Sequence, residues 1–225
     1  MGAEVQPSPA ARQRVLRAAV LCGVILPLPH GPLPAGTAHL CIDMQRLFAE
    51  PTPWQTPWMA HTRPVAERLA RHRPESNVFT RFIPPHRPED AGGAWLRYFD
   101  RWRELTGEIV EPHLLELVPE LKVLAPAGLV VDKSVYSAFH DGRLAPHLQR
   151  QGIDTLVVSG TETDVCVLAS VLAAVDHGFR VVVAVDALCS SADATHDALV
   201  QVYRDRFGQQ IEPATVDTIL AQWDA

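Results

Sequence analysis

DTLVVSGTETDVCVLASVLAAVDHG, residues 154–178, contains the strand, turn and helix that decide the fold. DTLVV is a short apolar run rich in β-branched residues, and it is closed by a serine and Gly160, as expected for a buried strand. CVLASVLAAVDHG is apolar on nearly every side and stops at Gly178, which is typical of a buried helix. A buried strand that leads directly into a buried helix indicates a parallel sheet covered by helices.

Cys166 lies where this helix is expected to begin, with Thr163 or Asp164 as its N-cap. The unpaired backbone N–H groups and the positive end of the helix dipole favour an anion at that place. A thiol there is expected to lose its proton more easily than a free cysteine does. The alternative is that Cys166 is only a small apolar residue of the core.

The same alternation of strands and helices extends along the chain from residue 36. Strands are expected at residues 38–43, 76–82, 128–133, 154–160 and 179–188, and the longer helices at residues 61–73, 94–107, 142–152 and 192–208. Apolar, β-branched strands separated by helices predict an α/β fold. It has a single open, mostly parallel sheet with helices on both faces and right-handed crossovers, which is a Rossmann-like arrangement.

Composition and charge restrict the classes of partner. The 225 residues are 47% hydrophobic and 20% charged, which suits one globular domain with a sizeable core. The net charge of −6 gives no electrostatic reason to expect a nucleic acid or an anionic membrane surface as partner. The cysteines are widely spaced and predict reduced thiols in a cytoplasmic protein rather than disulfides or a zinc site: Cys22, Cys41, Cys166 and Cys189.

The first 35 residues differ from the rest. ARQRVLRAAVLCGVILPLP, residues 11–29, has arginines followed by an apolar run and so resembles a signal peptide, but it has no clean cleavage site. The apolar run is too short to span a membrane. We expect residues 1–35 to be a non-catalytic extension, either an added helix or an overlong start assignment, and residues 36–225 to be the functional domain; secretion is the alternative.

Polar residues follow the expected strands at their carboxyl ends, where open parallel sheets bind ligands. These places are occupied, in chain order, by Asp43 with Gln45, Thr80 with Arg81, Asp132 with Lys133, the turn that leads to Cys166, and Asp186. A carboxylate, an ammonium group and a thiol are therefore expected to meet at one edge of the sheet although they are far apart in sequence.

These three groups suit covalent hydrolysis. A thiolate of Cys166 can attack a carbonyl carbon if a base removes its proton, and Asp43 can carry that proton to a departing amine. Lys133 can hold Asp43 in place and favour the thiolate, while backbone N–H groups of the turn before Cys166 can bind the developing oxyanion. Neither His140 nor His196 is needed as the base, although either could serve.

CIDMQ, DKSVYSAF and GTETDVCV, residues 41–45, 132–139 and 160–167, resemble the three signature segments of the isochorismatase-like cysteine hydrolase superfamily. The resemblance extends from about residue 36 to residue 220. It implies a six-stranded parallel sheet and a triad of Asp43, Lys133 and Cys166, with the cysteine as nucleophile.

The resemblance also implies a cis peptide bond between Thr161 and Glu162. In the superfamily this bond turns the backbone N–H groups of Glu162 and Cys166 toward the oxyanion. Superfamily members generally form dimers or tetramers, so a homo-oligomer is expected.

One departure from the family pattern concerns metal. Nicotinamidases of the superfamily carry Asp-x-His and a further histidine after the second strand, whereas this chain has FTRFIPPHRPED at residues 79–90. There is no Asp-x-His, and His86 is a lone imidazole in a Pro-rich loop. We therefore expect neither a metal nor another cofactor.

The sequence thus predicts a metal-independent cysteine hydrolase that cleaves a C–N bond of a small amide or ureide through a thioester. The alternatives are a vinyl-ether hydrolase of the isochorismatase type, which needs no thiol, and a non-catalytic binding or redox protein on the same fold. The specific substrate stays open.

Substrate contacts are expected from Gln45, Arg81 and Phe139, and the pocket wall from residues 83–106. Arg81 could bind a substrate carboxylate, for example of an N-carbamoyl amino acid, or else form a surface ion pair. The aromatic run within the helix expected at residues 94–107 is more typical of a core or a subunit interface than of a substrate contact: Trp95, Tyr98, Phe99 and Trp102.

Overall fold

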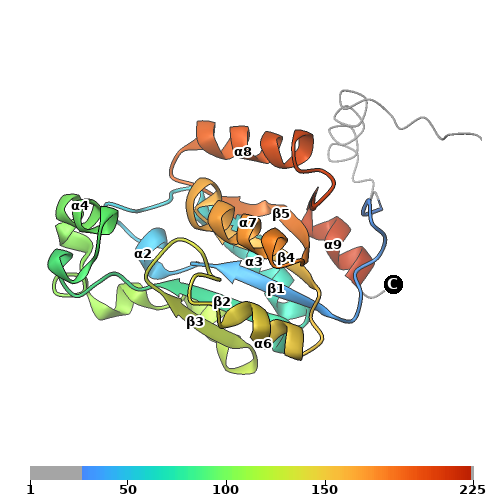
Figure 1. The fold of residues 1–225 in the computed structure, drawn as a ribbon, viewed down its shortest axis with the longest axis horizontal. Helices are drawn as coiled ribbons and strands as arrows, with labels where there is room; N and C mark the ends of the chain where they lie inside the picture. Colours follow the sequence, from blue (N-terminus) through green and yellow to red (C-terminus); the bar gives the residue numbers. More distant parts are fainter. Residues whose placement is uncertain (1–26, 224–225) are drawn as a thin grey trace, which may run out of the picture.

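Six parallel strands form one open sheet in the order β3-β2-β1-β4-β5-β6, which confirms the predicted fold class (Figure 1). The computed structural model describes residues 27–223. The strands are β1 Thr37–Ile42, β2 Asn77–Phe82, β3 Leu129–Lys133, β4 Thr155–Thr161, β5 Arg180–Cys189 and β6 Ile211–Ala214. The chain runs outward from β1 in one direction to β3 and in the other to β6, so the order of connections reverses between β1 and β4. That position is where open α/β sheets bind their ligands.

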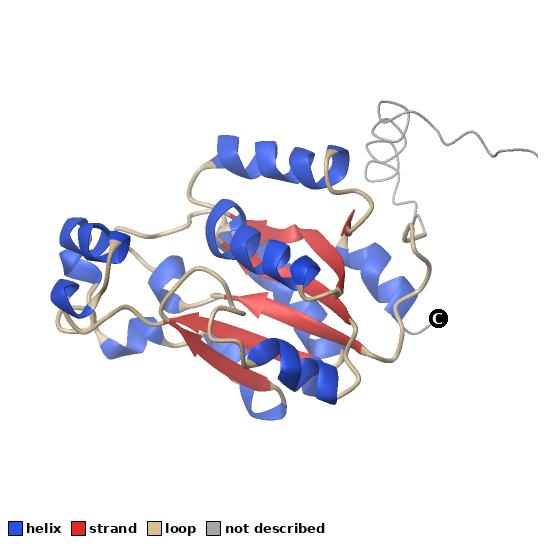
Figure 2. Ribbon diagram, viewed as in Figure 1, coloured by secondary structure: helices blue, strands red, loops and turns tan. Residues whose placement is uncertain are grey.

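Helices cover both faces of the sheet (Figure 2). The longer helices α3 Met59–His72 and α9 Val216–Trp223 pack on one face with the short α5 Pro119–Lys122, and α6 Leu144–Arg150, α7 Leu168–Asp176 and α8 Asp193–Asp205 lie on the other. Two further helices, α2 Arg46–Ala49 and α4 Ala94–Arg101, lie beyond the carboxyl ends of the strands (Figure 1). Successive residues of β1 serve the two cores in turn, since Leu40 and Ile42 join one cluster and Cys41 joins the other.

Six strands are confirmed, but the sequence pattern did not locate the edge strand β6. β6 has only four residues, IEPA, and includes a proline, so neither its length nor its composition indicates a strand. The position explains the proline, because β6 pairs only with β5 and a residue without an N–H is tolerated at an edge.

The helix expected at residues 94–107 is also shorter than predicted. It ends at Arg101 and continues only as a 3-10 turn, Arg103–Leu105. Four more 3-10 turns lie between other elements, at Pro74–Ser76, Pro88–Asp90, Pro112–Leu115 and Ala125–Ala127. Each of these four begins at or next to a proline, which pre-sets the helical φ.

A buried polar chain crosses the sheet from β2 to β4. The side-chain oxygen of Asn77 lies 2.7 Å from Nδ1 of His39, and Nε2 of His39 lies 2.7 Å from the hydroxyl of Ser159. An amide oxygen can only accept, so Nδ1 carries the proton and Nε2 accepts from the serine. Burial outweighs the hydrogen bond that His39 donates to Asn77 and lowers the pKa of His39 to about 4, which keeps the imidazole neutral.

The described residues before β1 pack against β5 and α9. Leu28 and Leu33 are buried, the N–H of Leu33 donates to the carbonyl of Gln222 at 2.8 Å, and Arg180 donates to the carbonyl of Gly31 at 2.7 Å. The remainder of residues 1–35, with most of the signal-like run and Cys22, lies outside the described residues. Over residues 27–223, no helix is long and apolar enough to cross a membrane.

Candidate active site

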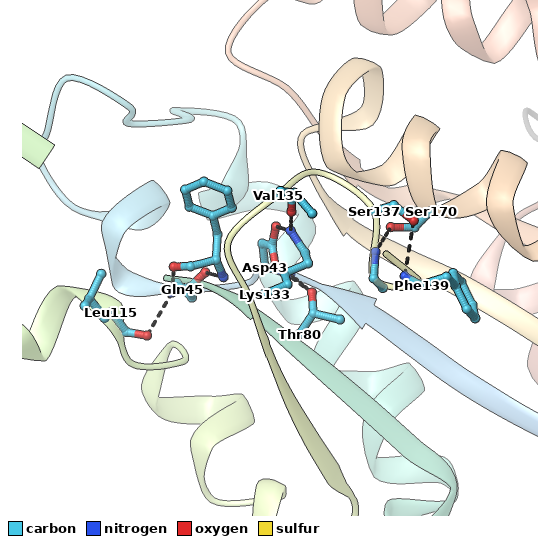
Figure 3. Close-up of polar contacts among 11 residues, drawn as sticks. Asp43, Gln45, Thr80, Leu115, Lys133, Val135, Ser137, Phe139 and Ser170 are labelled. Atoms are coloured by element: carbon cyan, nitrogen blue, oxygen red, sulfur yellow. Dashed lines mark hydrogen bonds and ion pairs between the residues drawn. The ribbon is translucent and has the colours of Figure 1, made fainter. Parts of the chain in front are cut away.

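Asp43 follows β1 directly and is held in an unusual backbone conformation. Its φ of 47° lies in the left-handed region that residues other than glycine rarely adopt, and its side chain is fully buried. Thr80 on the neighbouring strand β2 binds it twice: the threonine hydroxyl donates to Oδ1 at 2.5 Å and accepts the Asp43 N–H at 3.1 Å. The carboxylate is therefore fixed by the sheet itself (Figure 3).

Lys133, the last residue of β3, pairs with the other oxygen of this carboxylate. Its Nζ lies 2.6 Å from Oδ2 of Asp43 and 3.2 Å from the carbonyl of Val135, and it stands 5.1 Å from the centre of the Phe82 ring (Figure 3). Burial opposes the charged amine, but Asp43 and the thiol of Cys166 together raise the pKa of Lys133. A charged ammonium group therefore stays beside the carboxylate.

The end of β4 can approach β1 closely because position 160 is glycine. Gly160 has a φ of 118°, and a Cβ there would lie 2.0 Å from the carbonyl oxygen of Ile42. The next peptide bond, between Thr161 and Glu162, is cis.

Cys166 lies in a π-helical turn, Thr163–Val167, that leads into α7, so the start of the helix differs from the prediction. Glu162 is the N-cap, and neither Thr163 nor Asp164 caps the turn. Thr163 instead donates to the carbonyl of Cys189 at 3.1 Å. Asp164 accepts hydrogen bonds from Ser190 at 2.5 Å and from Thr195. These contacts fasten the turn that contains Cys166 to the end of β5 and to α8.

The thiol of Cys166 lies close enough to Asp43 and Lys133 for both to act on its pKa. Burial and the neighbouring carboxylate raise the pKa of Cys166, and the opposing effect of Lys133 is smaller. The expectation of a more acidic thiol is therefore wrong for the resting protein, because the helix terminus is buried and a carboxylate faces the sulfur. The sulfur keeps its proton and has a base next to it.

This thiol is part of the lining of a small open pocket. Aromatic rings from four separate parts of the chain form most of its wall, and the full set of lining residues is Phe48, Trp54, Phe82, Tyr98, Tyr136, Glu162, Val165 and Cys166. Trp54 is the centre of the aromatic cluster, stacked at 8° on Phe48 with 6.1 Å between ring centroids and tilted against Tyr98 at 5.8 Å.

The sequence missed most of this wall. Only Tyr98 comes from residues 83–106, the segment expected to line the pocket. Within the aromatic run of α4, Phe99 is a core residue as predicted, whereas Tyr98 faces the pocket. Trp54 gives no signal in the sequence because it lies in an irregular loop and reaches the pocket only through the fold.

The three expected substrate contacts have other partners in the structure. The amide of Gln45 is fully buried and binds backbone, donating to the carbonyl of Leu115 at 2.8 Å and accepting the N–H of Phe82 at 2.6 Å (Figure 3). Arg81 forms a bidentate pair with Asp132, with both bonds 2.7 Å long.

Phe139 is buried on the far side of its loop against the ring of Phe179, with 6.1 Å between the centroids. None of the three lines the pocket. Gln45 and Phe139 are thus core residues, and Arg81 is one half of a surface ion pair.

The other polar candidates also lie away from the thiol. His140 and His86 are exposed, and His196 binds the hydroxyl of Thr163 through Nδ1 at 2.8 Å. Asp186 accepts the N–H of Val216 at 2.9 Å, which fixes the start of α9. Within residues 27–223, no three histidine, cysteine, aspartate or glutamate side chains are grouped as metal ligands.

Comparison with known proteins agrees with the fold. The isochorismatase domain family matches residues 37–215. Maleamate amidohydrolase of Pseudomonas putida is 30% identical over 131 residues. The match spans 58% of this chain and 59% of that relative, which is less than two thirds of the relative's length.

Two solved structures resemble this one over most of the chain. The crystal structure of a cysteine hydrolase from Pseudomonas syringae pv. phaseolicola has a TM-score of 0.71 at 24% identity, covering 88% of this chain and 97% of its own. That of an isochorismatase family protein from Desulfovibrio vulgaris has a TM-score of 0.69 at 27% identity, covering 83% and 98%.

Proposed function

This chain belongs to the isochorismatase family, and from that premise we propose that it is a cysteine amidohydrolase acting on a small amide or ureide. The observation that carries the proposal is the buried Asp43–Lys133 pair, 2.6 Å apart, which lies beside the Cys166 thiol. This thiol lines an open pocket. Hydrolysis of a vinyl ether requires no nucleophilic sulfur, so Cys166 at this place favours the amide reaction.

In the first half of the reaction, Asp43 takes the proton of the Cys166 thiol and the thiolate attacks the amide carbon. Removal of the proton is aided because Lys133 stabilises negative charge at this site. The backbone N–H groups of Glu162 and Cys166 bind the oxygen as it gains charge. When the tetrahedral adduct collapses, the C–N bond breaks, Asp43 returns its proton to the nitrogen, and ammonia or an amine leaves.

The second half reverses these roles with water. Asp43 accepts a proton from a water molecule that attacks the thioester, the C–S bond breaks, and the sulfur regains a proton as the carboxylic acid departs. Asp43 thus acts twice as a proton carrier, which suits a group held rigidly between Thr80 and Lys133. The buried pair also argues against a non-catalytic protein, since taking two charges out of water is unfavourable unless the site uses them.

A screen of small amides and ureides for ammonia release tests the proposal. The panel contains maleamate, because a relative is named for it, together with crotonamide, benzamide and N-carbamoyl amino acids. At least one compound is expected to release ammonia with the wild type and none with Cys166→Ala. If the alanine variant releases ammonia at the wild-type rate, the thiol is not the nucleophile and the proposal is wrong.

A further inference from the structure

The pocket wall contains a single formal charge, and that charge is negative. Of the residues that line it, only Glu162 has a carboxyl group; the others are aromatic or apolar, apart from the thiol. A carboxylate within an aromatic pocket acts strongly on a bound ligand, because low-polarity walls weaken charge interactions less than water does.

Glu162 is held at the pocket by a backbone contact. Its Oε1 accepts the N–H of Ser191 at 2.9 Å, on the loop after β5. Its charge reaches the two phenols across the pocket: burial is the main cause that raises the pKa of Tyr98 and of Tyr136, and the Glu162 carboxylate adds to both. The carboxylate of Glu162 therefore lies close enough to both phenols to act on them, although its contribution is the smallest of the causes.

None of the residues that line the pocket is a lysine, an arginine or a histidine. The ammonium group of Lys133 is paired with Asp43 at 2.6 Å. Arg81, the residue that could have bound a carboxylate, is paired in bidentate fashion with Asp132 and is not in the wall. A carboxylated ligand would meet Glu162 with no compensating partner.

We infer that Glu162 is a specificity-determining residue that excludes negatively charged substrates, so the amide hydrolysed here has an uncharged, flat acyl group. The aromatic side chains Phe48, Trp54, Phe82 and Tyr98 would enclose such a group, and stacked or edge-on ring contacts favour a planar partner. This inference rests on the proposed amidohydrolase function and adds the class of substrate to it.

Alkylation of Cys166 tests the charge selection without any turnover. Iodoacetamide and iodoacetate have nearly the same size and leaving group but differ by one negative charge. The rate of modification at Cys166 is measured for each reagent by peptide mass spectrometry at low ionic strength. The rate with iodoacetamide is divided by the rate with iodoacetate, and this ratio is then divided by the same ratio for the free thiol 2-mercaptoethanol. Glu162→Gln keeps the length and the acceptor for Ser191, and Glu104→Gln, an exposed acid outside the pocket, removes the same net charge.

The wild-type ratio is expected to favour iodoacetamide by about tenfold or more over the free thiol, because like charges in one site repel strongly. Glu162→Gln should bring the ratio close to that of the free thiol, and Glu104→Gln should leave it unchanged. A wild-type ratio equal to that of the free thiol, a ratio unaffected by Glu162→Gln, or no modification of Cys166 by either reagent would each overturn the inference.

The two proposals fail separately. If charge selection is found but no amide in the panel releases ammonia, the proposed function is wrong while the role of Glu162 as a charge filter stands. If ammonia is released from maleamate as fast as from crotonamide, the function stands and the inference on substrate class is wrong.

Discussion

Thr80→Val should separate the position of Asp43 from its chemical identity. Valine matches threonine in shape but removes the hydroxyl that donates to the carboxylate at 2.5 Å and accepts the Asp43 N–H at 3.1 Å. A hydrogen bond to a charged group contributes about 1.5–3 kcal/mol, and a buried donor left unsatisfied costs about 1–3 kcal/mol. We therefore expect the free energy of unfolding to fall by about 3 kcal/mol.

The consequence for activity follows from the backbone at Asp43. Its φ of 47° is an unfavourable conformation that costs on the order of 1–3 kcal/mol and persists only while its surroundings impose it. Without the hydroxyl the carboxylate can turn away from the sulfur, so kcat should fall by about tenfold or more, as misplaced catalytic groups generally show.

Urea unfolding and steady-state kinetics measure the two effects, and Thr80→Ser is the matched control. The unfolding midpoint of the valine variant should move down by about 1–2 M urea. The serine variant keeps the hydroxyl and loses only a methyl group, so it should lose about 1 kcal/mol and retain most of its kcat. A valine variant as stable and active as the wild type would refute the reasoning, as would a serine variant that is equally impaired.

Three further outcomes are expected. Asp43→Asn should keep the circular dichroism spectrum and lose at least about 100-fold in kcat, because an amide cannot carry the proton; a loss smaller than tenfold would assign the base elsewhere. Iodoacetamide should modify Cys166 well before Cys41 and Cys189, which are 0% and 1% exposed and lie in the core; equal labelling of all three in peptide maps would contradict the pocket geometry. The free energy of unfolding should have its full value above pH 6.5 and should fall as the pH drops toward 4. In that range His39 binds a proton in the unfolded chain but stays neutral in the folded protein, where it is buried. This decline amounts to about 3 kcal/mol in urea titrations, from 1.36 kcal/mol per pKa unit, and should be absent from His39→Gln.

The sequence predicted the sheet well because buried parallel strands leave a simple pattern. The run TLVV lies in β4, which is buried throughout, and the run LVVDK marked β3 although that strand is a half-exposed edge of the sheet. The rule that ligands bind at carboxyl strand ends was enough to bring Asp43, Lys133 and Cys166 together. The position of the edge strand β6 could not be predicted, because a strand that pairs on one side tolerates a proline and needs few residues.

The failures at the site share one physical cause, which is that side-chain direction depends on tertiary contacts. Gln45 follows a strand end as Asp43 does, yet its amide turns toward the backbone of Phe82 and Leu115. Arg81 lies one residue after Thr80, and in an extended strand that single step points it away from the site. The aromatic wall was missed for the same reason, since Trp54 and Tyr136 belong to loops without a periodic pattern.

The central claim is that Cys166 forms a thioester, and rapid-quench mass spectrometry measures it directly. The protein is mixed with an amide that it hydrolyses, quenched in acid within milliseconds, and digested. The peptide that contains Cys166 should carry the mass of the acyl group in the wild type, and the adduct should disappear when hydroxylamine is added. Ammonia release with no acyl adduct on Cys166 at any time, together with retained activity in Cys166→Ala, would contradict the account.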